Sequence, residues 1–391
     1  MEAKSSELTY GATHVCGTEP ARTIRLLLDG RKLKDGGIGV YTENLITGLL
    51  ELGGVAITVL YRDERCLKAS YAGQVSWILD NAASYSLDEL LFMPRRVDFS
   101  AFDIFHTPHY MLPYRIPVPT VVTIHDLIHI THPEKFYYPW VARTLIRSAV
   151  RRANSVLTVS RHTRDGVVRL TNVSTDKVRY VPNSISERLR GTTASFDLHG
   201  DSHPYLFALF SNTKPHKGVR DLLAAYQKFR KDRRWQAFSQ RCPKLLLAGH
   251  GIERLMESPE GTALLEGVEG VRVAGSLSDS ELRSTLNRAV ALVVPSLVEG
   301  FCLPAIEAQA VGTPVICRPV PALQEIVTER DTVADTFSIE SFASALEKGA
   351  QVGLTLPRSV AQAHLELYSC KNVAAMVKAE YERVLAAGRS S

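Results

Sequence analysis

One stretch in the last third of the chain limits the possible folds more than any other. It opens with a continuous apolar run, Ala289–Pro295, of the kind required by a parallel strand that is covered on both faces. Pro304 suits the first turn of a helix, where its missing N–H would have no partner, and Gly312 marks the end of that helix. Residues 314–317 then begin another strand. The stretch therefore predicts a strand, a loop, a helix of about two turns and a second strand.

Two carboxylates lie in this stretch, Glu299 in the predicted loop and Glu307 on the predicted helix. Free N–H groups at a helix start attract anions, and those of Phe301, Cys302 and Leu303 would point back toward the end of the strand. We therefore expect a phosphate site there, flanked by the two glutamates. In the alternative interpretation, the glutamates only complement the dipole of the helix.

The same alternation of strands and helices continues along the chain. Strands are predicted at residues 23–29, 55–61, 103–107, 119–124, 155–159, 177–181, 205–210, 244–248 and 271–274. Most of these strands end in polar or glycine residues, and in a doubly wound sheet such ends share the edge where ligands bind. At 391 residues the chain exceeds one ordinary core. The sequence therefore predicts an α/β fold of two Rossmann-like, doubly wound parallel-sheet domains with a cleft between them.

The predicted organisation has five parts. A loose polar leader covers residues 1–22, and an N-terminal Rossmann-like domain covers residues 23–187. Residues 188–204 have little apolar periodicity, so we place the inter-domain connection there. A C-terminal Rossmann-like domain covers residues 205–368, and a terminal helix follows at residues 369–391.

The composition excludes several classes of protein. Hydrophobic residues make up 45% of the chain and charged residues 22%, and no apolar run approaches the roughly 20 residues of a membrane helix. The six cysteines form no Cys-x-x-Cys pair, which argues against a disulfide framework or a zinc knuckle. Because the leader also lacks the apolar core of a signal peptide, we expect a cytoplasmic protein. The net charge of +5 fits an anionic ligand or lipid surface, and no nucleic-acid-binding motif accompanies it.

The stretch beginning at Glu299 reads Glu-Gly-Phe-x-Leu-Pro-x-x-Glu-Ala with a trailing Gly-Thr-Pro-Val-Ile, and this pattern resembles the signature of family-four-type glycosyltransferases. Further motifs follow in the family's order, at Gly36–Leu45, Val122–Asp126, Thr158–Ser160, Val181–Asn183 and Lys214–Lys217. The resemblance implies a retaining enzyme of GT-B architecture, a nucleotide-sugar donor, no metal or other cofactor, and a terminal helix that crosses back to the first domain. It also implies that residues 23–187 form the acceptor-side domain and residues 205–368 the nucleotide-sugar-binding domain. Asn-Thr-Lys-Pro-His-Lys resembles mannosyltransferases in particular, which favours GDP-mannose over UDP-sugars.

The resemblance also implies roles for individual residues. Three predicted catalytic residues follow from it: Glu299 would contact hydroxyls of the donor sugar, Lys217 the diphosphate, and His125 would orient the donor or stabilise charge near the anomeric carbon. Glu307 would accept from the ribose hydroxyls. The predicted donor site is completed by Gly37, Gly39, Ser211, Lys214, Gly249, Ser276, Gly300, Phe301, Cys302 and Leu303, and the acceptor side by Tyr41, His109 and Asp126.

Three departures from the family pattern lie in the donor site. Cys302 stands where glycine is usual, and Ser211 and His216 each stand where arginine is frequent. Cys302 would narrow the site, and Lys214 is a candidate for supplying the missing positive charge.

Other functions remain open at this stage. Glu299 and Glu307 are also compatible with the acid–base pair of a glycoside hydrolase or phosphorylase, and a sugar-nucleotide-binding module without catalysis would carry the same motifs. Histidines spaced for zinc invite a metal site, but no cysteine or carboxylate set completes it; they are His106, His109, His125, His129 and His132.

Residues 137–153 form a basic, amphipathic segment with Trp140 near its start and arginines at helical spacing. Such a helix is expected to associate weakly with an anionic membrane surface and so reach a lipid-linked acceptor, the alternative being a plain solvated face. The expected acceptor is a sugar or a lipid-linked saccharide, in the synthesis of a surface polysaccharide, glycolipid or other glycoconjugate.

Overall fold

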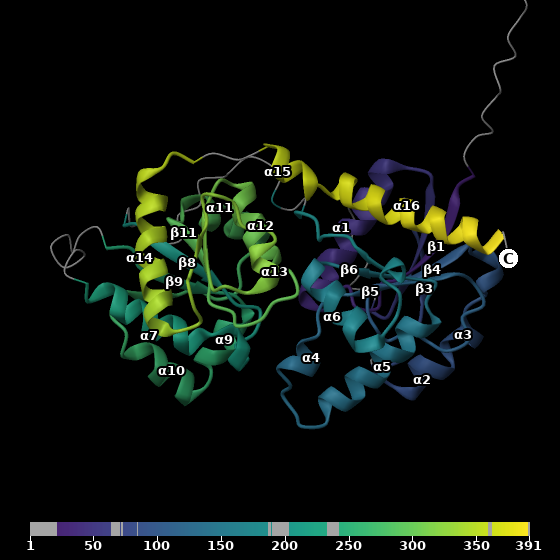
Figure 1. Ribbon diagram of the computed structural model, residues 1–391, viewed down its shortest axis with the longest axis horizontal. Helices are drawn as coiled ribbons and strands as arrows, with labels where there is room; N and C mark the ends of the chain where they lie inside the picture. Colours follow the sequence, from purple (N-terminus) through teal and green to yellow (C-terminus); the bar gives the residue numbers. More distant parts are fainter. Residues whose placement is uncertain are drawn as a thin grey trace, which may run out of the picture.

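The computed structural model describes residues 22–63, 71, 73–83, 85–186, 189, 203–232, 242–358 and 362–389. Residues 1–21 of the predicted leader lie outside the described residues, as do residues 188 and 190–202 of the predicted connection. The described chain forms two α/β domains, each built on a parallel sheet (Figure 1). The predicted fold class is therefore confirmed.

The first domain is built on a seven-stranded sheet in the order β3-β2-β1-β4-β5-β6-β7. Its strands are β1 (Ile24–Asp29), β2 (Val55–Tyr61), β3 (Ser76–Leu79), β4 (Ile104–Thr107), β5 (Thr120–Ile124), β6 (Ser155–Thr158) and β7 (Val178–Tyr180). All neighbours pair in parallel, so the carboxyl ends of the strands share one edge of the sheet. The central strands β4, β5 and β6 are buried throughout, as their apolar sequences predict.

Helices cover both faces of this sheet. Its helices are α1 (Gly36–Leu52), α2 (Leu87–Leu91), α3 (Met93–Arg96), α4 (Ile128–Thr131), α5 (Tyr138–Arg152) and α6 (Arg161–Thr171). One core cluster joins the sheet to α1, and the other joins it to α3, α5 and α6. Ser160 caps α6, because its side chain accepts a hydrogen bond from Thr163 N.

The second domain is built on a six-stranded parallel sheet in the order β10-β9-β8-β11-β12-β13. Its strands are β8 (Tyr205–Leu209), β9 (Lys244–Ala248), β10 (Val271–Val273), β11 (Ala291–Val294), β12 (Val315–Cys317) and β13 (Thr332–Val333). Its helices are α7 (Val219–Arg230), α9 (His250–Met256), α10 (Pro259–Glu266), α11 (Asp279–Arg288), α12 (Leu303–Ala310), α13 (Pro321–Gln324) and α14 (Ile339–Thr355). Helices α7, α9 and α14 pack on one face of the sheet, and α11, α12 and α13 on the other.

The end of the chain returns to the first domain. After α15 (Gln362–Leu367), helix α16 (Cys370–Arg389) runs along α1, as the yellow ribbon in Figure 1 shows. The two helices approach closely at Gly48, where a Cβ atom would lie 2.2 Å from the carbonyl oxygen of Cys370. Tyr381 and Val377 of α16 are fully buried in the core that α1 forms with the sheet. The terminal helix is thus part of the first domain's core.

None of the helices in the described residues is both long enough and apolar enough to span a bilayer.

Candidate active site

A cleft of about 600 Å³ lies where the carboxyl edges of the two sheets face each other. Among the residues predicted for the site, those that line it are Gly37, His125, Asp126, Ser211, Lys214, Lys217, Gly249, Ser276, Glu299, Gly300, Phe301, Cys302, Leu303 and Glu307. The structure thus brings together residues separated by up to about 270 positions in the sequence. A cavity of this size suits a nucleotide-sized ligand.

The loop between β11 and α12 forms one wall of the cleft. Buried β11 leads into it, and Leu303 and Pro304 form the first turn of α12, as Pro304 predicts. Cys302 is the N-cap of α12 and has a φ of 88°, a left-handed conformation that strains any residue with a Cβ atom. The first turn of α12 lines the cleft, and N–H groups at a helix start have no partner within the helix, so this turn is of the kind that binds anions.

An ion pair joins this loop to the loop after β8. The Nζ atom of Lys217 lies 2.6 Å from Oε1 of Glu299, and Ser296 Oγ donates to the same oxygen over 2.7 Å. Burial alone would lower the pKa of Lys217, but the negative charge of Glu299 more than offsets it, so the pKa is raised and the amine stays charged. The pair places a fixed cation and a carboxylate side by side at the start of α12.

Two glycines allow the close approaches on which this arrangement depends. At Gly218, where φ is 71°, a Cβ atom would lie 2.4 Å from the carbonyl oxygen of Pro295, so the Lys217 loop packs directly on the end of β11. At Gly300 a Cβ atom would lie 2.1 Å from the carbonyl oxygen of His125. Gly300 therefore lets the second domain touch the end of β5 in the first domain.

His125 follows β5 and faces the cleft from the first domain. Its Nε2 atom lies 3.1 Å from the carbonyl oxygen of Pro108, which can only accept, so Nε2 carries the hydrogen. Burial lowers the pKa of His125 to about 4, so the ring is neutral at neutral pH and Nδ1 is its acceptor nitrogen. The ring of Tyr41 meets His125 edge to face, with centroids 4.9 Å apart. His125 is thus suited to accept a hydrogen bond from a ligand hydroxyl.

Two further carboxylates line the cleft. Asp126 accepts from the backbone N–H of Ile128 over 2.9 Å, and burial raises its pKa. Glu307, on the inner face of α12, is only 1% exposed. Asp126 therefore holds the first backbone N–H of the short helix α4, while Glu307 presents a carboxylate to the predicted nucleotide site.

Three predicted residues lie behind the cleft wall rather than on it. Tyr41 is 3% exposed and bonds Thr123, and His109 is 6% exposed and bonds Tyr85 over 3.2 Å. At Gly39 a Cβ atom would lie 2.2 Å from the carbonyl oxygen of Leu33, so its smallness serves the turn before α1. Gly37 does line the cleft and approaches Leu303 of the other domain.

Lys214 bridges the mouth of the cleft. Its Nζ lies 2.5 Å from Oε1 of Glu134, in the loop between α4 and α5 of the first domain, and both side chains are 39% exposed. Ser276, which also lines the cleft, donates to Glu253 over 2.8 Å. Lys214 therefore contributes a positive charge to the cleft while it contacts the opposite domain.

The structure adds residues to which the sequence assigned no role. Asn183, Asn212, His250 and Asp279 line the cleft. Asn183 is 5% exposed, and its Oδ1 atom has no hydrogen-bond partner among the described residues. The sequence did contain a sign of this residue, since Asn183 ends the motif Val181–Asn183, to which no role was assigned.

The histidines that suggested zinc have other partners. His106 bonds Thr123 and Tyr381, and His129 bonds Tyr110 over 2.8 Å. Within the part of the chain that the structure describes, no three His, Cys, Asp or Glu side chains gather as metal ligands would.

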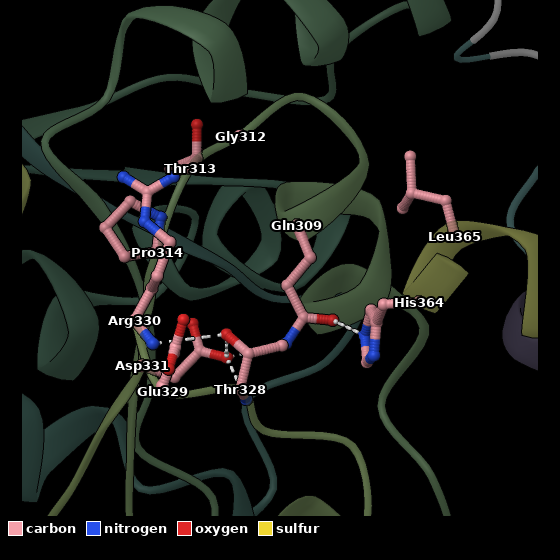
Figure 2. Close-up of a pocket in the computed structure, with 10 residues that line it drawn as sticks. All are labelled: Gln309, Gly312, Thr313, Pro314, Thr328, Glu329, Arg330, Asp331, His364 and Leu365. Atoms are coloured by element: carbon pink, nitrogen blue, oxygen red, sulfur yellow. Dashed lines mark hydrogen bonds between the residues drawn. The ribbon is translucent and has the colours of Figure 1, made fainter. Parts of the chain in front are cut away.

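A second, smaller cavity of about 160 Å³ lies in the second domain, away from the cleft (Figure 2). Asp331 accepts hydrogen bonds there from Gln309, Thr328 and the backbone of Val315, and His364 bonds Gln309 over 3.0 Å. The network ties α15 to the end of α12, so these polar groups serve the packing of the domain-crossing segment.

Comparison with known proteins identifies relatives across both halves. A family model described as Glycosyltransferase Family 4 matches residues 35–188, and one described as Glycosyl transferases group 1 matches residues 193–351. O-antigen chain mannosyltransferase B of Escherichia coli is 31% identical over 286 residues, which cover 67% of this chain and 70% of that protein. O-antigen chain mannosyltransferase RfbU of Salmonella typhimurium strain LT2 is 26% identical over 231 residues, 59% of this chain and 61% of the relative.

Solved structures agree in fold. Sucrose-phosphate synthase from Thermosynechococcus elongatus superposes with a TM-score of 0.69 at 18% identity, over 93% of this chain and 100% of that one. The Anabaena protein HepE, solved in complex with UDP-glucose, gives a TM-score of 0.60 at 15% identity, over 94% of this chain and 99% of that one. At these identities the similarity concerns the fold alone.

Proposed function

The chain belongs to the family-four-type glycosyltransferases of GT-B architecture, and from this premise we propose that it transfers a sugar from a nucleoside-diphosphate sugar to an acceptor hydroxyl with retention of anomeric configuration. GDP-mannose is the preferred donor in this proposal. The mannosyltransferase names of its relatives and the sequence Asn-Thr-Lys-Pro-His-Lys support that choice.

The observation that carries the proposal is the cluster of Lys217, Glu299 and Ser296 at the open start of α12. When the bond to the diphosphate breaks, negative charge grows on the leaving phosphate, and preorganised cations and N–H donors stabilise it. Lys217 and the first turn of α12 supply both without a metal ion. Glu299 then accepts from hydroxyls of the donor sugar, as an ionised carboxylate can do for two donors at once.

The substitution proceeds on one face of the sugar. The bond between the anomeric carbon and the phosphate oxygen breaks, the acceptor oxygen bonds to the same face, and its proton passes to the leaving phosphate. His125, neutral with an acceptor Nδ1, holds a hydroxyl of the donor sugar near the reacting carbon. Burial raises the pKa of Cys302, so this thiol is not an ionised nucleophile.

The acceptor in this proposal is a saccharide of a growing surface polysaccharide or glycolipid, presented at a membrane. Exposed aromatic residues support this placement, since Phe136 is 89% exposed and Trp140 is 72% exposed. On α5 beside them, Arg143, Arg147 and Arg151 are exposed, and no acidic residue occurs between Glu134 and Asp165. Basic helices with exposed aromatic residues favour weak association with anionic lipid.

The test is a thermal-shift screen against GDP, UDP, GDP-mannose and UDP-sugars, followed by transfer assays with the donor that binds. We expect GDP-mannose to raise the melting temperature most and the product to keep the donor's anomeric configuration, measured by NMR. Failure of a folded sample to bind any nucleotide sugar would overturn the proposal. Binding without turnover would favour a non-catalytic module, and hydrolysis of glycosides without nucleotide would favour a hydrolase.

A further inference from the structure

A chain of buried hydrogen bonds connects the terminal helix to the strand that carries His125. The hydroxyl of Tyr381 on α16 lies 2.6 Å from Nδ1 of His106, whose Nε2 lies 2.8 Å from Oγ1 of Thr123. Thr123 Oγ1 lies 3.1 Å from the hydroxyl of Tyr41 on α1. None of the four side chains is more than 3% exposed. The chain therefore joins two helices and two strands through groups that water does not reach.

Both supports of the His125 ring are connected to this chain. Tyr41, its last member, packs edge to face on the ring. Pro108, whose carbonyl oxygen accepts from Nε2 of His125, follows His106 by two residues, and Thr123 precedes His125 by two residues. A shift of His106 or Thr123 would therefore move a support of His125.

These hydrogen bonds are sensitive to the loss of any one hydroxyl, because the imidazole of His106 is neutral. Burial lowers the pKa of His106 to about 3, so one ring nitrogen donates and the other accepts. The two bonds of His106 run in one sense, since the neutral ring donates through one nitrogen and accepts through the other. In the Thr123–Tyr41 pair either hydroxyl can be the donor. Removing one hydroxyl leaves a buried nitrogen or oxygen without its partner and allows the remaining groups to rearrange.

We propose that Tyr381, acting through His106, Thr123 and Tyr41, is a positioning residue for His125, so that the domain-crossing helix completes the reaction site of the first domain. The inference rests on the proposed function, in which His125 holds the donor sugar. None of the four residues touches the substrate in this arrangement, and each acts on it only through His125.

A purely structural role for the chain predicts different measurements. If it only stabilises the core, breaking it lowers the melting temperature and leaves the turnover of the remaining folded enzyme unchanged. If it positions His125, breaking it lowers kcat and leaves the donor KM unchanged, because the nucleotide is held by the second domain. The state of the His125 ring also changes only in the second case.

The closest test compares Thr123→Val with Thr123→Ser. Valine keeps the shape and removes the hydroxyl, while serine keeps the hydroxyl. We expect Thr123→Val to lower kcat roughly 10- to 100-fold, the range expected for a misplaced reacting group, and Thr123→Ser to restore most of it. Tyr381→Phe should resemble Thr123→Val. Tyr226→Phe is the matched control, since it removes a buried hydroxyl that donates to Pro243 in the second domain.

Two-bond ¹H–¹⁵N spectra of histidine-labelled protein provide a readout that needs no activity. The wild-type protein should show His125 as the Nε2–H tautomer, and Thr123→Val should change its ring signals while Tyr226→Phe leaves them in place. Unchanged His125 signals, or equal kcat in the valine and serine variants, would overturn the inference. If no donor is turned over, the proposed function fails while the spectra still decide whether the chain positions His125. If Thr123→Val does not fold, Tyr41→Phe and Tyr381→Phe carry the same comparison.

Discussion

The two halves of the cleft are built in different ways. In the second domain, one continuous stretch from β11 through α12 supplies the carboxylate Glu299, the open helix start and Glu307. In the first domain, His125 depends on a carbonyl from the loop after β4, a ring from α1 and, through buried hydrogen bonds, a hydroxyl from α16. The carboxylates and the helix start of the donor wall are visible in one stretch of sequence, whereas the groups that support His125 become visible only in the fold.

The difference also separates how the halves should respond to substitution. Changes in the donor half act on the ligand directly, since Lys217, Glu299 and the first turn of α12 line the cleft themselves. Changes in the His125 half can act from a distance, because Tyr381 lies on the helix that returns after the second domain. Five predictions test this contrast, in order of decreasing effect.

The largest effect is expected for Glu299→Gln in the donor half. It removes the negative partner of Lys217, whose Nζ lies 2.6 Å away, and weakens the contact to the sugar. We expect kcat/KM to fall roughly 10²- to 10³-fold, as for the loss of one preorganised electrostatic contact. Steady-state kinetics measure it, with the exposed Glu329→Gln beside the second cavity as the control (Figure 2). Equal activity in both variants would contradict the assigned role.

His125→Ala is expected to lower kcat roughly 10²-fold with little change in nucleotide affinity, since it removes an orienting contact in the other half. The exposed His162→Ala is the control. The double variant His125→Ala with Thr123→Val should have the same kcat as His125→Ala alone, because both changes act through one ring. In the double variant Glu299→Gln with Thr123→Val, the two fold-losses in activity should multiply. If the kcat losses of His125→Ala and Thr123→Val multiply, Thr123 does not act through His125.

Acid should destabilise the protein through its buried histidines. Burial lowers the pKa of His125 and of His216 to about 4, while an unfolded chain has the ordinary value near 6.5. As the pH falls from about 6.5 to about 4, these histidines bind protons in the unfolded chain but not in the folded protein, so the free energy of unfolding falls. For His216 this amounts to on the order of 1–3 kcal/mol.

Denaturant melts between pH 7.5 and pH 4.5 test this directly. The sign follows from depressed folded-state pKa values: the stability is fully present above about 6.5 and is lost as the pH falls toward the folded values. His216→Asn should flatten the slope, and the exposed His162→Asn should not. An identical slope in all three proteins would show that His216 does not contribute.

Cys302→Gly tests whether the donor loop stores strain. The φ of 88° at Cys302 disfavours any Cβ atom, so glycine should be more stable there than alanine by about 1 kcal/mol. Thermal unfolding of Cys302→Gly and Cys302→Ala gives the difference, and both variants lack the thiol. Alanine at least as stable as glycine would mean that the loop relaxes in solution.

The smallest effect is expected at the mouth of the cleft. The pair of Lys214 and Glu134 joins the two halves, but both side chains are 39% exposed. Exposed pairs contribute about 0–1 kcal/mol and weaken with salt, so Glu134→Gln should change stability by less than about 0.5 kcal/mol. A larger, salt-independent loss would indicate that this contact holds the domains together.

The local sequence predicted most elements and the donor wall. The strand boundaries of β2 and β9 agree with the prediction, because apolar runs act over a few residues. Helix α14 was not predicted, although Phe342, Leu346 and Gly349 mark its buried face. The role of Gly39 as a packing position and the burial of His109 were also beyond local reasoning, since both depend on neighbours distant in sequence.

The sequence by itself determined the two-sheet architecture, the carboxylates and helix start of the donor wall, and the family. Apolar periodicity, proline and glycine act through short-range sterics and hydrogen bonding, and one stretch of chain contains them. Only the tertiary structure decided that Lys217 meets Glu299, that Gly300 admits the backbone of His125, and that Tyr381 reaches His106. Those contacts join segments about 80 to 275 residues apart. Their geometry and charge states depend on burial, and these groups are buried only once both domains and the returning helix have packed.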